Sequence, residues 1–177
     1  MIINARSGDN DALREIIKKY EHQVAATVIG MLGYCPEAED IGQETFIRFY
    51  KSLDKFRGDA SIGTYLTRIA INLSLNEVKR RKRQRKFFFS KSDNKIENIP
   101  DMSNPHDKNE VKKIIQLCIQ KLEPKFRAVI VLRLIDGYST RETAQILNLP
   151  AGTVLSRLAR AQMKLKEILI PLYRGET

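Results

Sequence analysis

The sequence contains no tryptophan, only two cysteines and two histidines, and no long apolar run. Cys35 and Cys118 lie far apart without CxxC spacing, so we expect reduced thiols and no disulfide. His22 and His106 have no ligand-type neighbours at metal spacing, which argues against a zinc site. Because no run reaches the ~18 apolar residues of a membrane span and the N-terminus has no apolar signal region, we expect a cytoplasmic protein.

The sequence also lacks the residue groupings that catalysis requires. It has no cluster of carboxylates with histidine, no activated nucleophile and no phosphate-cradling glycine loop. We therefore expect no catalytic residue, no cofactor, no metal ion and no small-molecule substrate.

Strand signals are nearly absent as well. Apolar residues recur at helical spacing, as they do between Leu13 and Val28, and this predicts an all-α fold.

Basic charge is concentrated in two blocks of the chain. The 177 residues carry a formal net charge of +10. Residues 1–78 hold 9 basic and 11 acidic side chains, whereas residues 79–86 (KRRKRQRK) hold 7 basic and no acidic ones. Residues 111–177 hold 12 basic and 5 acidic side chains. Such clustering favours a polyanionic partner over the alternative, a merely solvated basic surface.

The helical pattern is interrupted once, which predicts two small helical domains joined by a flexible linker. The interruption is rich in Ser, Asn and Asp, contains two prolines and shows no sustained period. It begins with Phe87-Phe88-Phe89, which either caps the core of the first domain or engages a partner. Within the first domain, Pro36 starts a second helix and Ile62 starts a third, which runs into the basic block. The predicted boundaries are 1–86 for the first domain, 87–110 for the linker and 111–177 for the second domain.

A helix-turn-helix pattern occurs in the second domain. Ser139 and Glu142 have the spacing of a capping box, in which the hydroxyl and the carboxylate satisfy free amides at a helix start. Asn148 favours the left-handed conformation that ends a helix, and Pro150 prevents its continuation. Gly152-Thr153 then open the next helix. The pattern predicts a helix-turn-helix, with an ordinary pair of antiparallel helices as the alternative.

The second helix of this motif is strongly cationic. Val154 and Leu158 fall on its inward side. No acidic residue occurs in it before Glu167. Hydroxyls and cations on the outward side are typical of a helix that contacts DNA. The residues expected to face outward are Ser156, Arg157, Arg160 and Lys164.

An acidic stretch begins at Pro36 in the first domain. The dipole of a helix favours acids in its first turn, which accounts for Glu37 and Glu39. It accounts less well for acids further along. Asp40, Gln43 and Glu44 are spaced i, i+3 and i+4, so they share one face of the helix. This face is a candidate docking surface for a basic protein.

The third helix has two distinct stripes at about 100° per residue. The first stripe is apolar and is predicted to form core. The second mixes an aromatic ring, amides and cations, which respectively stack on bases, read them and hold phosphates; a solvated face is the alternative. The apolar stripe is Ile62, Leu66, Ile69, Ala70 and Leu73, and the polar stripe is Tyr65, Arg68, Asn72, Asn76, Lys79 and Arg83.

Together these segments resemble the extracytoplasmic-function group of the sigma-70 family of bacterial RNA polymerase sigma factors. Residues 38–46 (AEDIGQETF) are similar to that family's polymerase-binding helix. Residues 56–61 (FRGDAS) and 65–72 (YLTRIAIN) are similar to its region for the −10 promoter element. Residues 152–161 (GTVLSRLARA) are similar to its −35 recognition helix. The resemblance covers nearly the whole chain and leaves only the linker unmatched.

The resemblance implies a subunit that binds core RNA polymerase and directs it to promoter DNA. The acidic face, through Asp40, Gln43 and Glu44, would bind the clamp helices of the largest subunit. The polymerase flap and an anti-sigma protein are further implied partners. Implied contacts to the −10 element are Arg57, Ser61, Tyr65, Arg68, Asn72, Asn76, Lys79, Arg80 and Arg83, and those to the −35 element are Thr153, Ser156, Arg157, Arg160 and Lys164.

Three positions depart from the family's usual residues. Tyr65 stands where the family usually has Trp, Leu155 replaces a usual Lys or Arg, and Gln162 replaces a usual Arg. With these departures the chain still resembles the same class of protein, but the promoter sequence that it would read is the property that the amino-acid sequence determines least. The alternative function is a free-standing helix-turn-helix regulator that dimerises through its first domain, although such a regulator does not need the polar stripe of the third helix.

Overall fold

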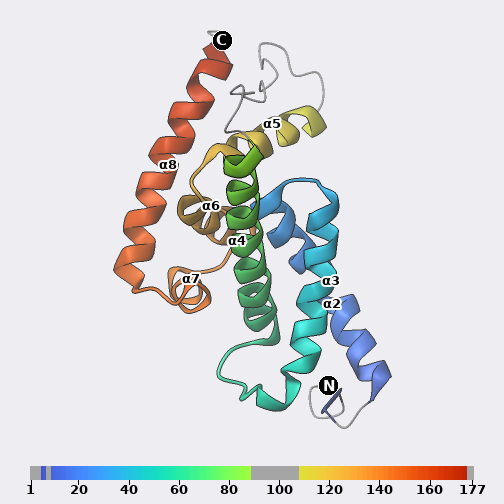
Figure 1. Ribbon diagram of the computed structural model, residues 1–177. Helices are drawn as coiled ribbons and strands as arrows, with labels where there is room; N and C mark the ends of the chain where they lie inside the picture. Colours follow the sequence, from blue (N-terminus) through green and yellow to red (C-terminus); the bar gives the residue numbers. More distant parts are fainter. Residues whose placement is uncertain (1–4, 7–8, 89–107, 175–177) are drawn as a thin grey trace.

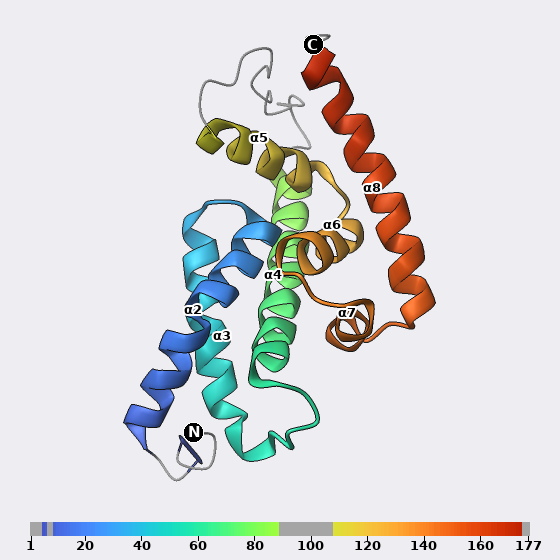
Figure 2. The same ribbon diagram turned by 180° about the vertical axis from the view of Figure 1, so that it is seen from behind.

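The chain folds into helices alone throughout the part that the structure describes. The computed structural model describes residues 5–6, 9–88 and 108–174 (Figure 1). No strand occurs in these ranges, which confirms the predicted all-α class. None of the helices in them is long and apolar enough to cross a membrane. An N-terminal bundle packs against a C-terminal group of helices, and the last helix of the bundle, α4 (Ile62–Phe88), faces that group (Figure 2).

The N-terminal bundle has three helices whose ends follow from local chemistry. The Asp9 carboxylate accepts hydrogen bonds from the amides of Asp11 and Ala12, which caps the first helix. Gly33 ends that helix with a φ of 79°, a conformation that glycine adopts readily. Pro36 opens the second helix, as predicted. The bounds are α2 (Asn10–Leu32), α3 (Pro36–Lys51), the short 3-10 turn η1 (Leu53–Lys55) and α4 (Ile62–Phe88).

The C-terminal group contains the predicted helix-turn-helix. A short helix continues directly into a π-helical turn, and a tight loop at Gly137 leads from there to the next helix. The last helix is long and lies along the outside of the group, with Pro171 near its end (Figure 1). The bounds are α5 (Lys108–Lys121), α6 (Pro124–Ile130), the π-helical turn η2 (Val131–Ile135), α7 (Thr140–Leu147) and α8 (Ala151–Arg174).

The main hydrophobic core is continuous between the two groups of helices. Leu66 and Ala70 of the predicted apolar stripe are fully buried, and Leu73 is nearly so. Ile62 and Ile69 of the same stripe are only partly buried and pack against the core, so the stripe is confirmed as the side of α4 that faces the core. Thr67 is also fully buried because α4 is covered on a second side by the C-terminal group. Val131, from that group, belongs to the same buried cluster. The two domains therefore share a core in this conformation.

The helices extend beyond the predicted domain boundaries. The prediction placed the linker at 87–110, but α4 runs to Phe88 and α5 begins at Lys108. Phe87 and Phe88 are thus the last two residues of α4, whereas residues 89–107 lie outside the described residues. The predicted linker and the role of the Phe87-Phe88-Phe89 segment are therefore not tested. The second helix, predicted to start at Pro36, does so and ends at Lys51.

Candidate nucleic-acid interface

The turn between α7 and α8 has the predicted capping chemistry. The amide of Glu142 donates to Ser139 Oγ at 3.2 Å, and the amide of Ser139 donates to Glu142 Oε2 at 2.9 Å. These two bonds form the capping box and hold the pKa of Glu142 below its ordinary value. Asn148 adopts φ 52° and ψ 54°, the left-handed conformation, and the amides of Asn148 and Leu149 both donate to the carbonyl of Ala144. The helix-turn-helix is confirmed at the level of individual bonds.

The first turns of α8 present a polar surface outside and an apolar one inside. Val154 is completely buried, as predicted, and Leu158 is partly buried. Ser156 and Arg160 are exposed, while Thr153 and Arg157 are partly buried. Ser156 Oγ donates to the carbonyl of Thr153, which fixes the hydroxyl against the helix. Leu155, one of the departures from the family, is 54% exposed on this surface.

Lys164 is held against α6 and is not a free cation. Its Nζ lies 3.6 Å from Glu123 Oε1 and 5.6 Å from the centroid of the Phe126 ring. Lys125 Nζ lies closer to the same carboxylate, at 3.0 Å, and hydrogen bonds from the two lysines lower the pKa of Glu123. Lys164 is exposed on α8, but the sequence spacing did not reveal Glu123 as its partner, because Glu123 comes from the turn between α5 and α6.

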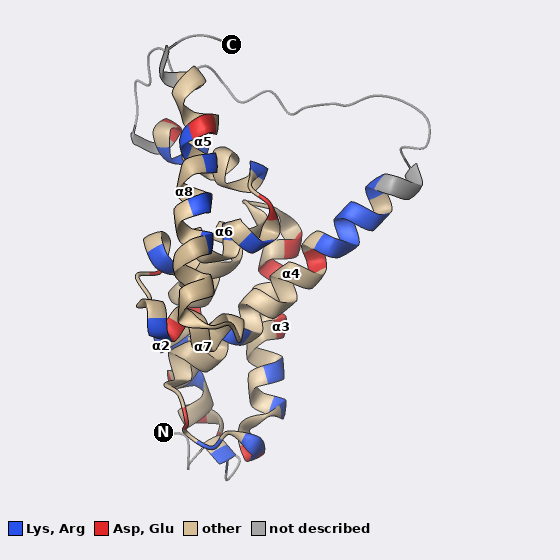
Figure 3. Cartoon of the chain, turned by 90° about the vertical axis from the view of Figure 1, so that its left-hand side faces the viewer, with Lys and Arg blue, Asp and Glu red and all other residues tan. Residues whose placement is uncertain are grey.

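The polar stripe of α4 divides into an exposed part and a covered part. Asn72, Asn76, Lys79 and Arg83 are exposed, and the basic end of the helix projects away from the body of the molecule (Figure 3). Arg68, earlier in the helix, is partly buried, and its Nη2 donates to the carbonyl of Gln145 in α7 at 3.0 Å. A continuous stripe in the sequence is thus only partly a free surface in this conformation.

Tyr65 lies in an aromatic cluster at the start of α4. Its ring packs edge-on to Phe56 at a centroid distance of 5.1 Å and to Phe49 at 6.1 Å. Phe49 is fully buried and Phe56 nearly so. This packing orients Tyr65 and leaves its ring only partly exposed. The helical spacing predicted which side of α4 carries Tyr65. It could not predict the partners of the ring, because they come from α3 and the loop that follows it.

The loop before α4 and its first turn hold two further predicted residues. Arg57 is exposed in the loop. Ser61 is exposed too, but its Oγ accepts a hydrogen bond from the amide of Thr64 at 3.1 Å and so caps α4. Arg6 donates to the carbonyls of Leu53 and Phe56, which fastens the loop to the N-terminal end of the chain.

An ion-pair cluster at Glu77 engages two of the arginines of the basic block. Arg80 donates to both oxygens of Glu77 at 2.7 and 2.8 Å, and Arg81 Nε donates to one of them at 2.9 Å. Arg81 Nη2 also reaches Glu37 of α3 at 3.1 Å. The hydrogen bonds from Arg80 lower the pKa of Glu77 despite its burial. The i, i+3 and i+4 spacing to Glu77 was the available signal, and the prediction of Arg80 as a DNA contact did not use it.

The predicted acidic face of α3 is exposed and includes apolar residues. Asp40 and Gln43 are exposed, and Glu44 pairs with Arg48 at 2.7 Å. Ile47 and Tyr50, 46% and 50% exposed, follow on the same side of the helix because they lie one and two turns further along. Sequence reasoning missed both. The signal was their i+3 and i+4 spacing from Gln43, Glu44 and one another.

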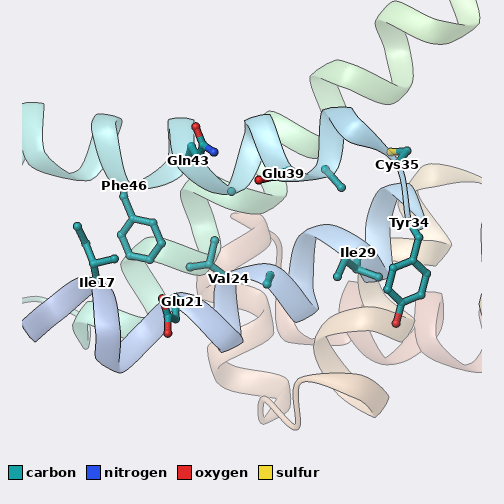
Figure 4. Close-up of a pocket in the computed structure, with 12 residues that line it drawn as sticks. Ile17, Glu21, Val24, Ile29, Tyr34, Cys35, Glu39, Gln43 and Phe46 are labelled. Carbon is teal, nitrogen blue, oxygen red and sulfur yellow. The ribbon is translucent and has the colours of Figure 1, made fainter. Parts of the chain in front are cut away.

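A groove of about 510 Å³ runs beside this face, between α2 and α3. Figure 4 shows Phe46 pointing from α3 toward Ile17 of α2, with Tyr34 at the far end of the groove. Glu21 and Glu39 add carboxylates to an otherwise largely apolar lining. The groove therefore has an apolar floor with carboxylates at its border, and the neighbouring acidic face of α3 likewise carries both carboxylates and apolar side chains.

Comparison with known proteins places the chain in a family. The family model described as sigma-70 region 2 matches residues 16–84, and the model described as sigma-70, region 4 matches residues 112–165. The chain is 35% identical to the ECF RNA polymerase sigma factor SigW of Bacillus subtilis over 95% of this chain and 94% of that protein. It is 33% identical to the ECF RNA polymerase sigma-E factor of Escherichia coli over 98% and 95% of the two chains.

Solved structures agree in fold. The chain matches CnrH, solved in complex with the cytosolic domain of CnrY, with a TM-score of 0.70 at 24% identity over 95% of this chain and 94% of that chain. It matches the sigma factor RpoE of Bartonella quintana, solved with the anti-sigma factor NepR, with a TM-score of 0.69 at 21% identity over 88% and 95%. The chain belongs to the extracytoplasmic-function group of the sigma-70 family. Members of this family are transcription initiation factors, not catalytic enzymes.

Proposed function

We propose that this sigma factor binds core RNA polymerase through α3 and directs it to promoters, reading the −10 element with α4 and the −35 element with α8. The observation that carries the proposal is the separation of three exposed surfaces by charge and chemistry. One is acidic with apolar residues, and two are cationic with amides or hydroxyls. Residues 1–86 would form the polymerase-binding and −10 module and residues 111–177 the −35 module, which agrees with the two matched family models.

The polymerase-docking face is α3 from Asp40 to Tyr50. Its carboxylates would attract a basic partner, while Ile47 and Tyr50 would supply the apolar and aromatic contact that interface centres usually contain. Gln43 lies one turn from both Asp40 and Ile47, between the acidic part of the face and its apolar part. The clamp helices of the largest subunit, the partner that the family resemblance implies, would fit a surface of this kind.

The −10 surface is the exposed part of α4 with the preceding loop. Asn72 and Asn76 present amides that pair with base edges, and Lys79 and Arg83 extend a cationic track for phosphates. Arg57 lies in the loop ahead of the helix. Tyr65 would contribute one partly exposed edge of its ring, while Ser61 would act mainly through its cap on α4. Arg80, paired with Glu77, would contact phosphate only weakly.

The −35 surface is the start of α8. Ser156, Arg157 and Arg160 would enter the major groove as the recognition helix of a helix-turn-helix does. Thr153 would stand at the N-terminal end of this surface. Lys164 would contact the phosphate backbone at its edge after leaving Glu123. The polymerase flap is the proposed protein partner of this module.

An anti-sigma protein is a further proposed partner. It is supported by the two structural neighbours, each of which was solved in complex with such a protein or with a cytosolic domain. The groove between α2 and α3 and the exposed Leu155 and Met163 of α8 are apolar surfaces that an inhibitor would cover.

The test of the proposed function is polymerase binding and promoter selection by the purified chain. We expect it to co-elute with core polymerase and to support transcription from a cognate promoter, with little specific binding to duplex DNA alone. A paired change, Asp40→Lys with Glu44→Lys, should abolish co-elution, while Asp54→Lys on the neighbouring turn should not. Tight palindrome binding without polymerase would instead identify a free-standing regulator.

A second test separates promoter opening from polymerase binding. Asn72→Ala should reduce opening of the −10 element and leave co-elution with polymerase intact, because Asn72 is exposed and contacts no other helix through a hydrogen bond among the described residues. Equal loss of both properties would show that Asn72 has a structural role.

A further inference from the structure

The outward side of α8 carries apolar as well as polar side chains near its start. The inward side is defined by Val154 and Ala161, which are completely buried. At about 100° per residue, Ser156 and Ala159 lie on the opposite side, and both are exposed. Leu155, one residue after Val154, is 54% exposed and borders that side. The part of α8 that would enter the major groove is therefore partly apolar.

Leu155 is not needed to fill the core. Leu158 and Leu165 of the same helix pack against the main buried cluster, and Leu172 belongs to the smaller one. Because about half of its surface stays in water, Leu155 adds little hydrophobic burial to the fold. A substitution at this position therefore changes what α8 recognises more than how the chain folds.

The place of Leu155 along α8 is that of a residue that reads bases. The helix begins at Ala151, so Leu155 lies within its first two turns. In a helix-turn-helix the N-terminal residues of the recognition helix contact base edges. Arg157 and Arg160 follow two and five residues later, and no acidic residue precedes Glu167 in this helix. The charges around Leu155 therefore favour DNA as its partner over an apolar protein surface.

The polar groups beside Leu155 are partly engaged within the chain. Ser156 Oγ donates to the carbonyl of Thr153 at 3.1 Å, so its proton is used by the helix itself. Thr153 and Arg157 are partly buried, whereas Arg160 is exposed. Few free donors thus remain in the first turns of α8, and apolar contact carries a larger share of the recognition of bases.

A leucine side chain can read only one feature of the major groove. Thymine presents its C5-methyl group there, while guanine presents the acceptors N7 and O6. A lysine or arginine at this position, as the family usually has, would donate to both of these guanine atoms. Leu155 has no donor, and its contact with guanine would remove water from N7 and O6 without replacing it. Contact with the thymine methyl group instead buries apolar surface on both partners.

Ala159 extends the apolar contact by one helical turn. It follows Leu155 at i+4, so the two side chains are neighbours on the surface of α8. Ala159 is exposed and small, which allows the helix to approach the bases closely enough for Leu155 to reach a methyl group. The two residues form an apolar strip beside the guanidinium of Arg160.

We propose that Leu155 is a specificity-determining residue of this chain, which selects thymine at one position of the −35 element through the C5-methyl group. Ala159 supports the contact, and Arg160 binds the neighbouring backbone or base. The inference rests on the proposed function of α8 and adds to it the base that this helix prefers. The −35 element of this chain would therefore carry thymine at the position where a cation in place of Leu155 would select guanine.

The first test is the selection of promoters by holoenzyme assembled from core polymerase and the full chain. Templates randomised in both the −35 and the −10 element are transcribed, and the productive templates are sequenced. The natural chain should enrich thymine at one −35 position. Leu155→Ala should lose that preference alone, and Leu155→Arg should replace thymine by guanine. Both variants should keep the −10 preference of the natural chain, which controls for folding and for polymerase binding.

The second test removes only the methyl group. Uracil replaces the selected thymine in a promoter, and the affinity of holoenzyme for the two promoters is compared. We expect the natural chain to lose affinity about fourfold, the weight of one buried methyl group, and Leu155→Ala to lose none. Ile170→Ala is the matched control, because Ile170 is an exposed apolar residue near the other end of α8, and this variant should keep the fourfold difference.

The outcomes separate this proposal from the proposed function. If Leu155→Ala keeps the thymine preference, or if uracil binds as well as thymine, Leu155 does not read the methyl group and the proposal is wrong. If Leu155→Ala weakens polymerase binding without changing the base preference, Leu155 contacts protein and the proposal is wrong as well. In these cases the natural chain still selects both promoter elements, so the proposed function stands. If the natural chain selects neither element, the proposed function fails and this inference fails with it.

Discussion

Asn148 determines how the chain turns between α7 and α8. It is the one non-glycine residue with positive φ among the described residues. Left-handed backbone costs an ordinary L-residue roughly 1–2 kcal/mol, less for Asn and nothing for Gly. Asn148→Gly should therefore leave the free energy of unfolding nearly unchanged, and Asn148→Val should lower it by about 1–2 kcal/mol. Urea denaturation followed by circular dichroism measures both, and equal effects would contradict the assigned conformation.

Asp136 makes stability depend on pH. Burial raises the pKa of Asp136 from 3.8 to about 6, and the hydrogen bond from Thr27 offsets only part of this rise. Between pH 4 and 6 the folded chain therefore binds more protons at this residue than the unfolded chain. The free energy of unfolding contributed by Asp136 falls as pH rises through that window.

Asp136→Asn tests this sign. The variant should be more stable than the natural chain at pH 7.5, and its advantage should shrink toward pH 4, where the natural carboxyl is protonated. Denaturation midpoints measured across this range give the difference directly. Asp54→Asn, a change at an exposed carboxylate, is the control and should show no such trend. A constant difference across the range would contradict burial of an ionised Asp136.

Residues whose structure follows from near neighbours were predictable, and residues with distant partners were not. Ser139 and Asn148 belong to patterns of three to ten residues, so capping chemistry alone identified them. Arg68 and Tyr65 were placed on the correct helix, but Arg68 is bonded to a carbonyl 77 residues away and Tyr65 packs on rings from α3 and its loop. Helical periodicity predicts which side of the helix a side chain lies on, but it does not predict which residues from other parts of the chain pack against that side.

At the scale of elements, α4 serves as core helix at one end and as cationic rod at the other. Its first half is covered on two sides, while its second half projects with Lys79 and Arg83 exposed (Figure 3). Helical spacing predicted the core stripe correctly because Leu66 and Ala70 face the bundle. It did not predict the second covered side, since that depends on the C-terminal group.

The projecting half of α4 gives a prediction on salt dependence. Each phosphate contact that is removed lowers the slope of log K against log salt by about 0.9 for duplex DNA and about 0.7 for single strands. Lys79→Gln with Arg83→Gln should reduce the slope for promoter binding by holoenzyme by roughly 1.5. Arg14→Gln, in which an exposed cation of α2 paired with Asp11 is lost, should leave the slope unchanged. An unchanged slope in the first variant would remove α4 from the phosphate-binding surface.

At the scale of the whole molecule, the two matched regions share one main hydrophobic core. The main cluster of buried residues contains side chains from both regions, so unfolding one region exposes apolar surface of the other. A small second cluster of Ile114, Cys118 and Leu172 lies within the C-terminal group alone. The natural chain should unfold in one transition with the same midpoint for probes in either region. Gly30→Lys should give two midpoints, because a Cβ at Gly30 would lie 2.9 Å from both Cγ atoms of Val131 in the C-terminal group and would push the two regions apart. Calorimetry provides the check, and two transitions in the natural chain would contradict a shared core.

Side chains of the C-terminal group also complete the last turn of α2, because Gln116, Gln120 and Arg127 donate to the carbonyls of residues 29, 30 and 31. α2 ends at Leu32 and α3 begins at Pro36, so these carbonyls lie five to seven residues before the start of α3. If separation of the C-terminal group from the N-terminal bundle changed the affinity of α3 for polymerase by some factor, polymerase binding would change the equilibrium of that separation by the same factor, because linkage is reciprocal. The chain would then behave as a thermodynamic transducer, in which occupancy of one helix sets the exposure of another.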